Sequence, residues 1–164
     1  MSPKLVRDLM HIGVTTCPAN TSLADATRIL LNQNLETLIV LNGNGHAIGV
    51  FGREEAVAAY ARTGTGLRED ITRTVADAMR TEIPTIPPDI PAAAAAQLML
   101  DHGVRDIYLM HRDGGIGWPA AVLRFRDVLR YLAARSDDEI ADMGAGATRK
   151  SPLDLFKERH KKAT

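Results

Sequence analysis

The chain has 164 residues, of which 45% are hydrophobic and 24% charged, enough for one compact domain with a sizeable core. Lysine plus arginine and aspartate plus glutamate both number 20, so the net charge favours neither nucleic acid nor a membrane surface as the partner. The lone cysteine, Cys17, excludes an internal disulfide and is expected to be a small buried hydrophobe. No apolar run reaches membrane-spanning length and no secretory leader is evident, so the sequence predicts a cytoplasmic protein.

The first half of the chain is predicted to alternate short helices and strands. Ser22, with Asp25 three residues later, is expected to cap a helix, and Asn34 is expected to end it in the left-handed conformation. The other elements expected here are a short helix over 6–10, a strand over 13–17, strands over 37–41 and 47–51 joined by a tight turn, a helix over 53–62 and a glycine-rich linker over 63–66.

The second half is predicted to repeat this order. Five consecutive alanines, residues 92–96, supply helix propensity but little volume, so another element is expected to approach closely there. The elements expected are a helix over 91–102 that Asp89 caps and Gly103 ends, strands over 106–110 and 119–123, and a helix over 126–135 that continues over 136–143.

The last part of the chain differs in character from the rest. Residues 144–164 contain six basic and two acidic residues, and they are predicted to form a basic, partly disordered tail. The alternative is a docking segment for a protein partner or for a phosphate backbone. We therefore expect three parts: a first repeat with its linker over 1–66, a second repeat over 67–143 and the tail over 144–164.

The similarity of the two halves indicates an internal duplication. Residues 6–10 (VRDLM) match residues 75–79 (VADAM), 69 residues later, and residues 16–20 match residues 85–89 at the same offset. The offset grows to 72 where residues 49–57 match residues 121–129. Because the difference of three residues falls in a turn, the second copy is expected to have a longer hairpin loop.

The junction between the strand around residues 121–123 and the next helix is the first candidate site. Asp127 falls in the first helical turn, where its carboxylate meets the positive end of the helix dipole, and Arg124 and Arg126 flank it. One acid and two bases at such a junction suit a ribose-phosphate, because the acid accepts hydroxyl hydrogens and a guanidinium holds phosphate oxygens. The alternative is a dipole-matched aspartate between solvated arginines.

A duplicated β-α-β-β-α unit, with each copy ending in a strand, a junction and a helix, resembles a pair of cystathionine-β-synthase (CBS) domains. The residues that carry the resemblance are the helix ends at Met10 and Met79, the Thr-x-Pro segments at Thr16 and Thr85, and the two junctions. The resemblance implies an α/β (α+β) fold in which both repeats pack through their sheets into a pseudo-twofold module. It also implies clefts between the copies for adenosine-containing ligands, and a homodimer formed through helix faces.

The resemblance also implies which residues bind. Asp127 would accept hydrogen bonds from the ribose hydroxyls, and Arg124 stands in the family's threonine position beside the phosphates. The complete second-copy site would be Asp127, Arg124, Arg126, Thr85, Ile86, Ile107 and Tyr108. A weaker first-copy site would be Thr16, Cys17, Ile39, Arg53 and Glu55. The first copy departs from the pattern because Glu55 is one methylene longer than the family's aspartate.

Two functions remain open at this point. One is a regulatory sensor that binds AMP, ADP, ATP, NAD or S-adenosylmethionine, with no further cofactor, and modulates a separate protein partner. The other is a ligand-free homodimeric scaffold that uses its helix faces and the basic tail, the tail being the one part suited to nucleic acid. An enzyme is not expected, because the sequence has no phosphate-binding loop and no nucleophile motif. No metal is expected either, because the five histidines lack metal-ligand spacing.

Overall fold

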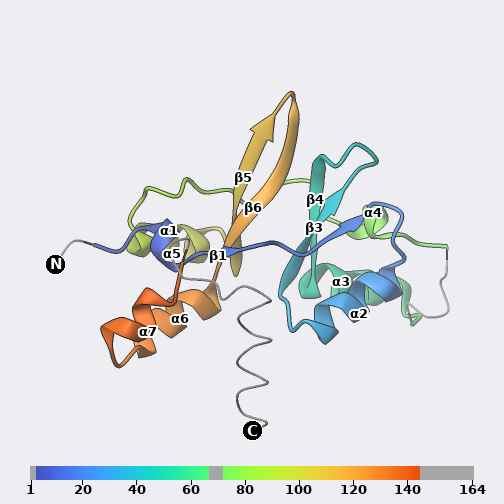
Figure 1. Ribbon diagram of the computed structural model, residues 1–164. Coiled ribbons are helices and arrows are strands. Elements are labelled where there is room, and N and C mark those ends of the chain that lie inside the picture. Colours follow the sequence, from blue (N-terminus) through green and yellow to red (C-terminus); the bar gives the residue numbers. More distant parts are fainter. Residues whose placement is uncertain (1–2, 67–71, 145–164) are drawn as a thin grey trace, which may run out of the picture.

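Two three-stranded sheets lie next to each other in the computed structural model, which describes residues 3–66 and 72–144 (Figure 1). The strand orders are β2-β3-β4 and β1-β6-β5. The strands are β1 (His11–Ile12), β2 (Thr16–Pro18), β3 (Thr37–Leu41), β4 (Ala47–Gly52), β5 (Asp106–Asp113) and β6 (Ile116–Arg124). The helices are α1 (Val6–Leu9), α2 (Leu23–Asn32), α3 (Arg53–Thr63), α4 (Val75–Ala78), α5 (Ala92–Asp101), α6 (Phe125–Ala133) and α7 (Asp137–Ala141).

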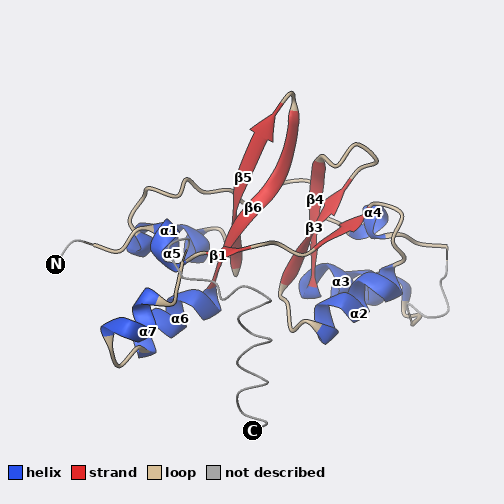
Figure 2. Cartoon of the chain, viewed as in Figure 1, coloured by secondary structure: helices blue, strands red, loops and turns tan. Residues whose placement is uncertain are grey.

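The sheets form the centre of the molecule and the helices lie outside them (Figure 2). A buried cluster that includes Ile39, Val50, Tyr108 and Val122 joins β3 and β4 to β5 and β6. Helices α2, α3 and α4 share a second cluster with the β2-β3-β4 sheet. Helices α1, α5 and α6 share a third with the other sheet. The predicted fold, two β-α-β-β-α repeats packed through their sheets, is therefore confirmed.

The leading segment of each copy packs on the other copy. It consists of α1 and β1 in the first copy, and of α4 and the residues up to Arg80 in the second. Strand β1 pairs antiparallel with β6, where His11 lies opposite Val122, and the Val6 N–H donates to the Ile90 carbonyl at 2.9 Å. In the reverse direction, Val50 of β4 and Arg80 exchange two backbone hydrogen bonds, of 2.8 and 2.9 Å. Figure 1 shows the same exchange: α1 lies beside α5, and α4 lies beside α2 and α3.

The Thr-x-Pro segment of each copy adds to the opposite edge of its own sheet. Strand β2 runs parallel to β3, with Thr16 opposite Ile39. Thr85 forms the equivalent parallel bridge to Tyr108, held by the Ile86 N–H on the Tyr108 carbonyl at 2.9 Å. Each sheet thus contains two strands and a Thr-x-Pro segment from one copy, and a leading segment from the other.

Several expected local features are confirmed. The Ser22 hydroxyl accepts the Asp25 N–H at 3.1 Å, which caps α2, and Asn34 ends that helix with a φ of 52°. The close approach to the alanine run is made within the chain, since the Ala92 N–H donates to the Lys4 carbonyl at 2.8 Å and Ala95 is fully buried. Cys17 is buried, and burial raises the pKa of its thiol.

Other expectations were wrong, and long-range contacts explain two of them. The strand expected over 13–17 is instead two strands, because β1 pairs with one sheet and β2 with the other. Asp89 does not cap α5; it forms an ion pair of 2.5 Å with Arg7 of the exchanged helix α1. The last helix does not continue past residue 135, because Ala134 is extended and Ser136 caps a separate helix, α7. The expected tail lies outside the described residues from residue 145 onward.

Candidate functional site

Two buried acids occupy equivalent junctions of the two copies. Glu55 and Asp127 are each the third residue of a helix that follows directly from a strand, α3 after β4 and α6 after β6. Their residues are 7% and 4% exposed. A carboxylate at this position is close to the unpaired N–H groups that begin a helix and to the positive end of its dipole. What separates the two acids is which groups their oxygens contact.

Asp127 is held by its own helix. Its Oδ2 accepts the Arg124 backbone N–H at 2.9 Å, so this carboxylate caps the start of α6. Burial raises the pKa of Asp127, and the Arg124 N–H and guanidinium oppose that rise. The Arg124 side chain is half-buried next to this acid. One oxygen of this carboxylate is thus already bound by the backbone of its own helix. This agrees with the alternative in which Asp127 serves its helix and binds no ligand.

Glu55 is held from the other copy. Its Oε1 forms an ion pair of 2.5 Å with Nε of Arg80, whereas its Oε2 is buried and has no hydrogen-bond partner among the described residues. Gly52, the counterpart of Arg124, leaves no room for a side chain here. A Cβ at that position would lie 2.6 Å from the Glu36 carbonyl oxygen and 3.0 Å from Oε2 of Glu55. The first-copy junction therefore presents a buried acceptor that none of the described residues satisfies.

A cavity of about 580 Å³ lies at this junction, and we refer to it as the Glu55 cleft. Its first-copy lining is Glu36, Thr37, Arg53, Glu54, Glu55 and Val57, and its second-copy lining is Arg80, Gly103, Val104 and Arg105. A second cavity of about 310 Å³, the Thr85 cavity, is lined by Thr85, Ile107 and neighbouring residues. Arg80 and Val104 line both, so the two cavities adjoin.

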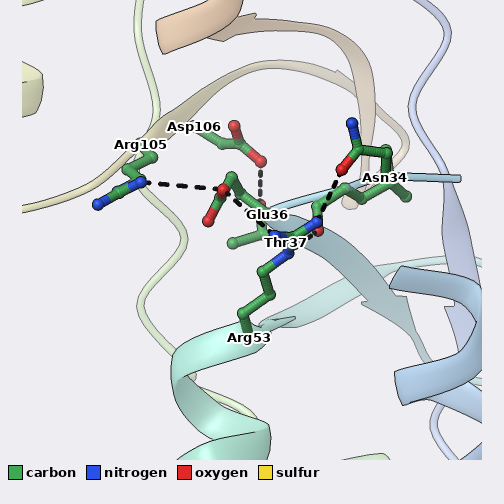
Figure 3. Close-up of polar contacts among 7 residues, drawn as sticks. Asn34, Glu36, Thr37, Arg53, Arg105 and Asp106 are labelled. Atoms are coloured by element: carbon green, nitrogen blue, oxygen red, sulfur yellow. Dashed lines mark hydrogen bonds and ion pairs between the residues drawn. The ribbon is translucent and has the colours of Figure 1, made fainter. Parts of the chain in front are cut away.

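A polar seam joins the copies beside the Glu55 cleft (Figure 3). The Thr37 hydroxyl donates to Oδ2 of Asp106 at 2.5 Å and accepts from the Tyr108 hydroxyl. Burial raises the pKa of Asp106, and the Thr37 hydroxyl bond opposes that rise; burial likewise raises the pKa of Tyr108. Oδ1 of Asp106 is buried and finds no hydrogen-bond partner within the described ranges.

Charged side chains complete the seam. Figure 3 shows Arg53 reaching back toward Asn34, and its Nε and Nη2 donate to the Leu35 carbonyl at 2.8 Å and to Asn34 Oδ1 at 3.0 Å. Arg105 of the second copy lies 3.9 Å from Oε1 of Glu36 and 5.9 Å from the centre of the Phe125 ring. Arg53 is thus fixed by its own copy, whereas the contacts of the Arg105 side chain with other described residues are long.

The structure divides the residues that the sequence assigned to binding. Thr85 and Ile107 line the Thr85 cavity, and Arg53 and Glu55 line the Glu55 cleft, while Asp127 lines neither of these two. Arg124 and Arg126 lie with Asp127 at the start of α6, and Thr16 pairs with β3. The side chains of Cys17, Ile39, Ile86 and Tyr108 are buried in the apolar clusters.

The residues that sequence reasoning missed come mainly from the other copy. Arg80, Gly103, Val104 and Arg105 reach the Glu55 cleft across the seam. The sequence contained one signal for Arg80: it directly follows Met79, as His11 directly follows Met10, so the two residues hold equivalent positions in the repeats. Within the described ranges, no cluster of histidine, cysteine and acidic side chains could hold a metal ion. No helix in that part of the chain is long and apolar enough to cross a bilayer.

Comparison with known proteins identifies the repeat. A family model described as the CBS domain matches residues 6–62 and 75–134. No curated protein matches the chain. The CBS-domain containing protein ATU1752 from Agrobacterium tumefaciens is similar in structure, with a TM-score of 0.67 and 19% identity over 78% of this chain and 98% of that one.

Two further similar structures contain ligands. The CBS domain pair of protein MJ0100, in complex with 5′-methylthioadenosine and S-adenosyl-L-methionine, has a TM-score of 0.63 and 19% identity over 79% of this chain and 100% of that one. CBSX2 in complex with AMP has a TM-score of 0.62 and 21% identity over 78% of this chain and 95% of that one. At these identities, the likeness establishes the fold.

Proposed function

The chain belongs to the CBS-domain family, and from that premise we propose that it is a regulatory module, not an enzyme, that binds an adenosine ligand and thereby modulates a protein partner. Two similar CBS pairs support the ligand class, since one was solved with S-adenosyl-L-methionine and 5′-methylthioadenosine and the other with AMP. The free thiol of Cys17 suits a reducing compartment, so we place the protein in the cytoplasm.

The observation that carries the proposal is the buried Oε2 of Glu55, which has no hydrogen-bond partner in the described part of the chain. An unsatisfied buried acceptor costs about 1–3 kcal/mol, and a hydroxyl donor from a ligand would remove that cost. A ribose offers two such hydroxyls. We therefore propose the Glu55 cleft as the working site, in place of the Asp127 junction that the sequence ranks first.

The size and lining of the adjoining cavities support a nucleoside as the occupant. The Glu55 cleft of about 580 Å³ lies within the usual range of roughly 300–1,000 Å³ for small-molecule sites. The Thr85 cavity adds the apolar side chains of Ile83, Pro84 and Ile107, against which a planar base can pack. The proposed pose therefore puts the ribose at Glu55 and the adenine toward Thr85.

Thermal melting with added ligand tests this function. A ligand at about 100 times its dissociation constant stabilises the fold by roughly 2.7 kcal/mol, which for a chain of this size raises Tm by about 5–10 °C. We expect such a shift from at least one of AMP, ADP, ATP, NAD and S-adenosylmethionine. Glu55→Gln should remove most of it and Asp127→Asn, its matched control in the other copy, should remove little. The proposed site is wrong if Asp127→Asn is the damaging change.

A second candidate function, the homodimeric scaffold, is favoured by the exposed helix faces. Leu31 and Leu100, Val57 and Leu129, and Tyr60 and Leu132 occupy equivalent positions of the two copies, and all six side chains are exposed. Three apolar surface positions that recur in both copies form two similar faces, one on α2 and α3 and one on α5 and α6. A second copy of the chain, which carries the same faces, is the proposed occupant.

A further inference from the structure

We propose that Arg80 makes the Glu55 cleft selective for adenosine ligands that carry a 5′-phosphate, by leaving Glu55 for the phosphate when the ribose hydroxyls reach that carboxylate. This inference rests on the proposed function, and it names the ligand class that the same site prefers. Arg80 belongs to the second copy. It lines the Glu55 cleft of the first copy because each leading segment packs on the other copy.

The backbone of Arg80 is fixed on the sheet of the first copy. Two hydrogen bonds of 2.8 and 2.9 Å tie it to Val50 of β4. The preceding residue, Met79, lies so close to β4 that a Cβ on Gly49 would be 2.5 Å from its sulfur. The Arg80 side chain therefore starts from a defined point at the cleft, and it is 41% exposed there. It can change partners without any movement of its backbone.

The present partner of Arg80 is the group that a ribose would use. Its Nε contacts Oε1 of Glu55 at 2.5 Å, and Oε2 of the same carboxylate is buried without a partner in the residues that the structure describes. Vicinal hydroxyls that donate to both oxygens compete with Arg80 for this carboxylate. A displaced guanidinium needs another anion, and phosphate matches its planar fork of donors.

The other cations of the cleft are less suited to this exchange. Arg53 donates to the Leu35 carbonyl and to Asn34, so its guanidinium is committed to its own copy. Arg105 lies 3.9 Å from Glu36, and its partner is not the carboxylate that the ribose would occupy. The acids Glu36, Glu54 and Glu55 balance these cations, so a phosphate gains little from net charge in the cleft, and Arg80 is the guanidinium whose present partner the ribose would displace.

Ligand selectivity follows from this exchange. AMP supplies the hydroxyls for Glu55 and the phosphate for Arg80, whereas adenosine supplies the hydroxyls alone and leaves Arg80 without its anion. Because hydrogen bonds to charged groups are strong, AMP should bind about ten- to a hundredfold more tightly than adenosine. 5′-Methylthioadenosine, which has the ribose hydroxyls but no anionic group for Arg80, should bind no better than adenosine.

Titration calorimetry with AMP and adenosine, a pair that differs only in the phosphate, tests the inference on the full chain. In Arg80→Gln the affinity ratio should fall to within about threefold of unity, with adenosine binding kept. Arg80→Lys, which keeps the charge but not the fork, should give an intermediate ratio, and it also serves if the glutamine variant does not fold. Arg112→Gln, the same charge change on the exposed β5–β6 hairpin, should leave the ratio unchanged.

The outcomes separate the two proposals. Equal affinities of the wild-type protein for AMP and adenosine would overturn the role of Arg80 and leave the adenosine site intact. A preference for AMP that survives in Arg80→Gln would also overturn it. Binding of neither ligand would overturn the proposed function itself.

Discussion

Replacing Gly49 by alanine should destabilise the protein more than any exposed glycine substitution, because the leading segment of the second copy lies directly on β4. A Cβ at Gly49 would be 2.5 Å from Sδ of Met79 and 2.6 Å from the carbonyl oxygen of Arg80. Real Cβ atoms do not approach backbone oxygens this closely, so the segment 79–80 has to move away. That movement stretches the two backbone hydrogen bonds between Arg80 and Val50.

The expected magnitude follows from these contacts. Overpacking a filled site costs roughly 1–3 kcal/mol, and weakening two backbone hydrogen bonds adds about 0.5–1.5 kcal/mol each. We expect Gly49→Ala to lower the free energy of unfolding by about 2–6 kcal/mol. At about 2–4 °C per kcal/mol for a chain of this size, Tm falls by roughly 4–24 °C. Urea unfolding followed by far-ultraviolet circular dichroism measures the first quantity and a thermal melt the second.

Gly43→Ala is the matched control. A Cβ there meets none of the described residues within 4 Å, and its backbone is not in the left-handed region, so the change should shift stability by less than about 0.5 kcal/mol. Equal stabilities of the two variants would show that segment 79–80 does not lie on β4. The exchange of leading segments, and with it the position of Arg80, would then be wrong.

Two further predictions concern the seam and the helix faces. Since burial raises the pKa of Asp106, the folded state favours its protonated form; its contribution to stability is fully present below the unfolded pKa of about 3.9 and is lost as pH rises through the folded pKa. Asp106→Asn, whose amide oxygen still accepts from Thr37, should therefore be more stable than the wild type by about 1–3 kcal/mol at pH 7. Urea melts should show that this gain vanishes near pH 4. A loss of stability at pH 7 would contradict the prediction. Light scattering should give the wild type a mass near twice 17.8 kDa, and Leu100→Glu a monomer, whereas Trp118→Glu on the hairpin should remain a dimer. A dimeric Leu100→Glu would remove α5 from the interface.

The elements that the sequence predicted well are those whose signals are local. Strand β3 has the expected bounds, Thr37–Leu41, because five consecutive apolar or β-branched residues lie between a helix end and a turn. Ser22 and Asn34 act as expected because a cap needs only its own helix. The longer loop expected in the second hairpin was wrong. β5 and β6 extend to Asp113 and Ile116, so the extra residues lengthen the strands, and the connection, residues 114–115, is shorter than residues 42–46 of the first copy.

The features that the sequence missed depend on residues far away in the chain. Nothing in residues 11–17 indicates that His11 pairs with Val122 while Thr16 pairs with Ile39, since the two partners belong to different copies. Asp89 has a suitable position for a cap, but the fold brings Arg7 within 2.5 Å of its carboxylate, and the two form an ion pair. The sequence ranked Glu55 below Asp127 by side-chain length, and it does not show which group each carboxylate binds in the fold: the Arg124 N–H for Asp127 and the Arg80 guanidinium for Glu55.

The Glu55 cleft and the exposed apolar face of the first copy share helix α3. The cleft takes Glu55 and Val57 from the first two turns of α3, and Arg80 and Arg105 from the other copy, so a ligand there contacts both copies at once. Val57 is also one of the exposed apolar residues of the face on α2 and α3. A ligand that binds Glu55 therefore acts on a helix that belongs to both the site and the proposed interface. At the Asp127 junction the equivalent acid is held by its own helix, through the N–H of Arg124, and not by the other copy. If the module signals through its helix faces, the signal should start in the first copy.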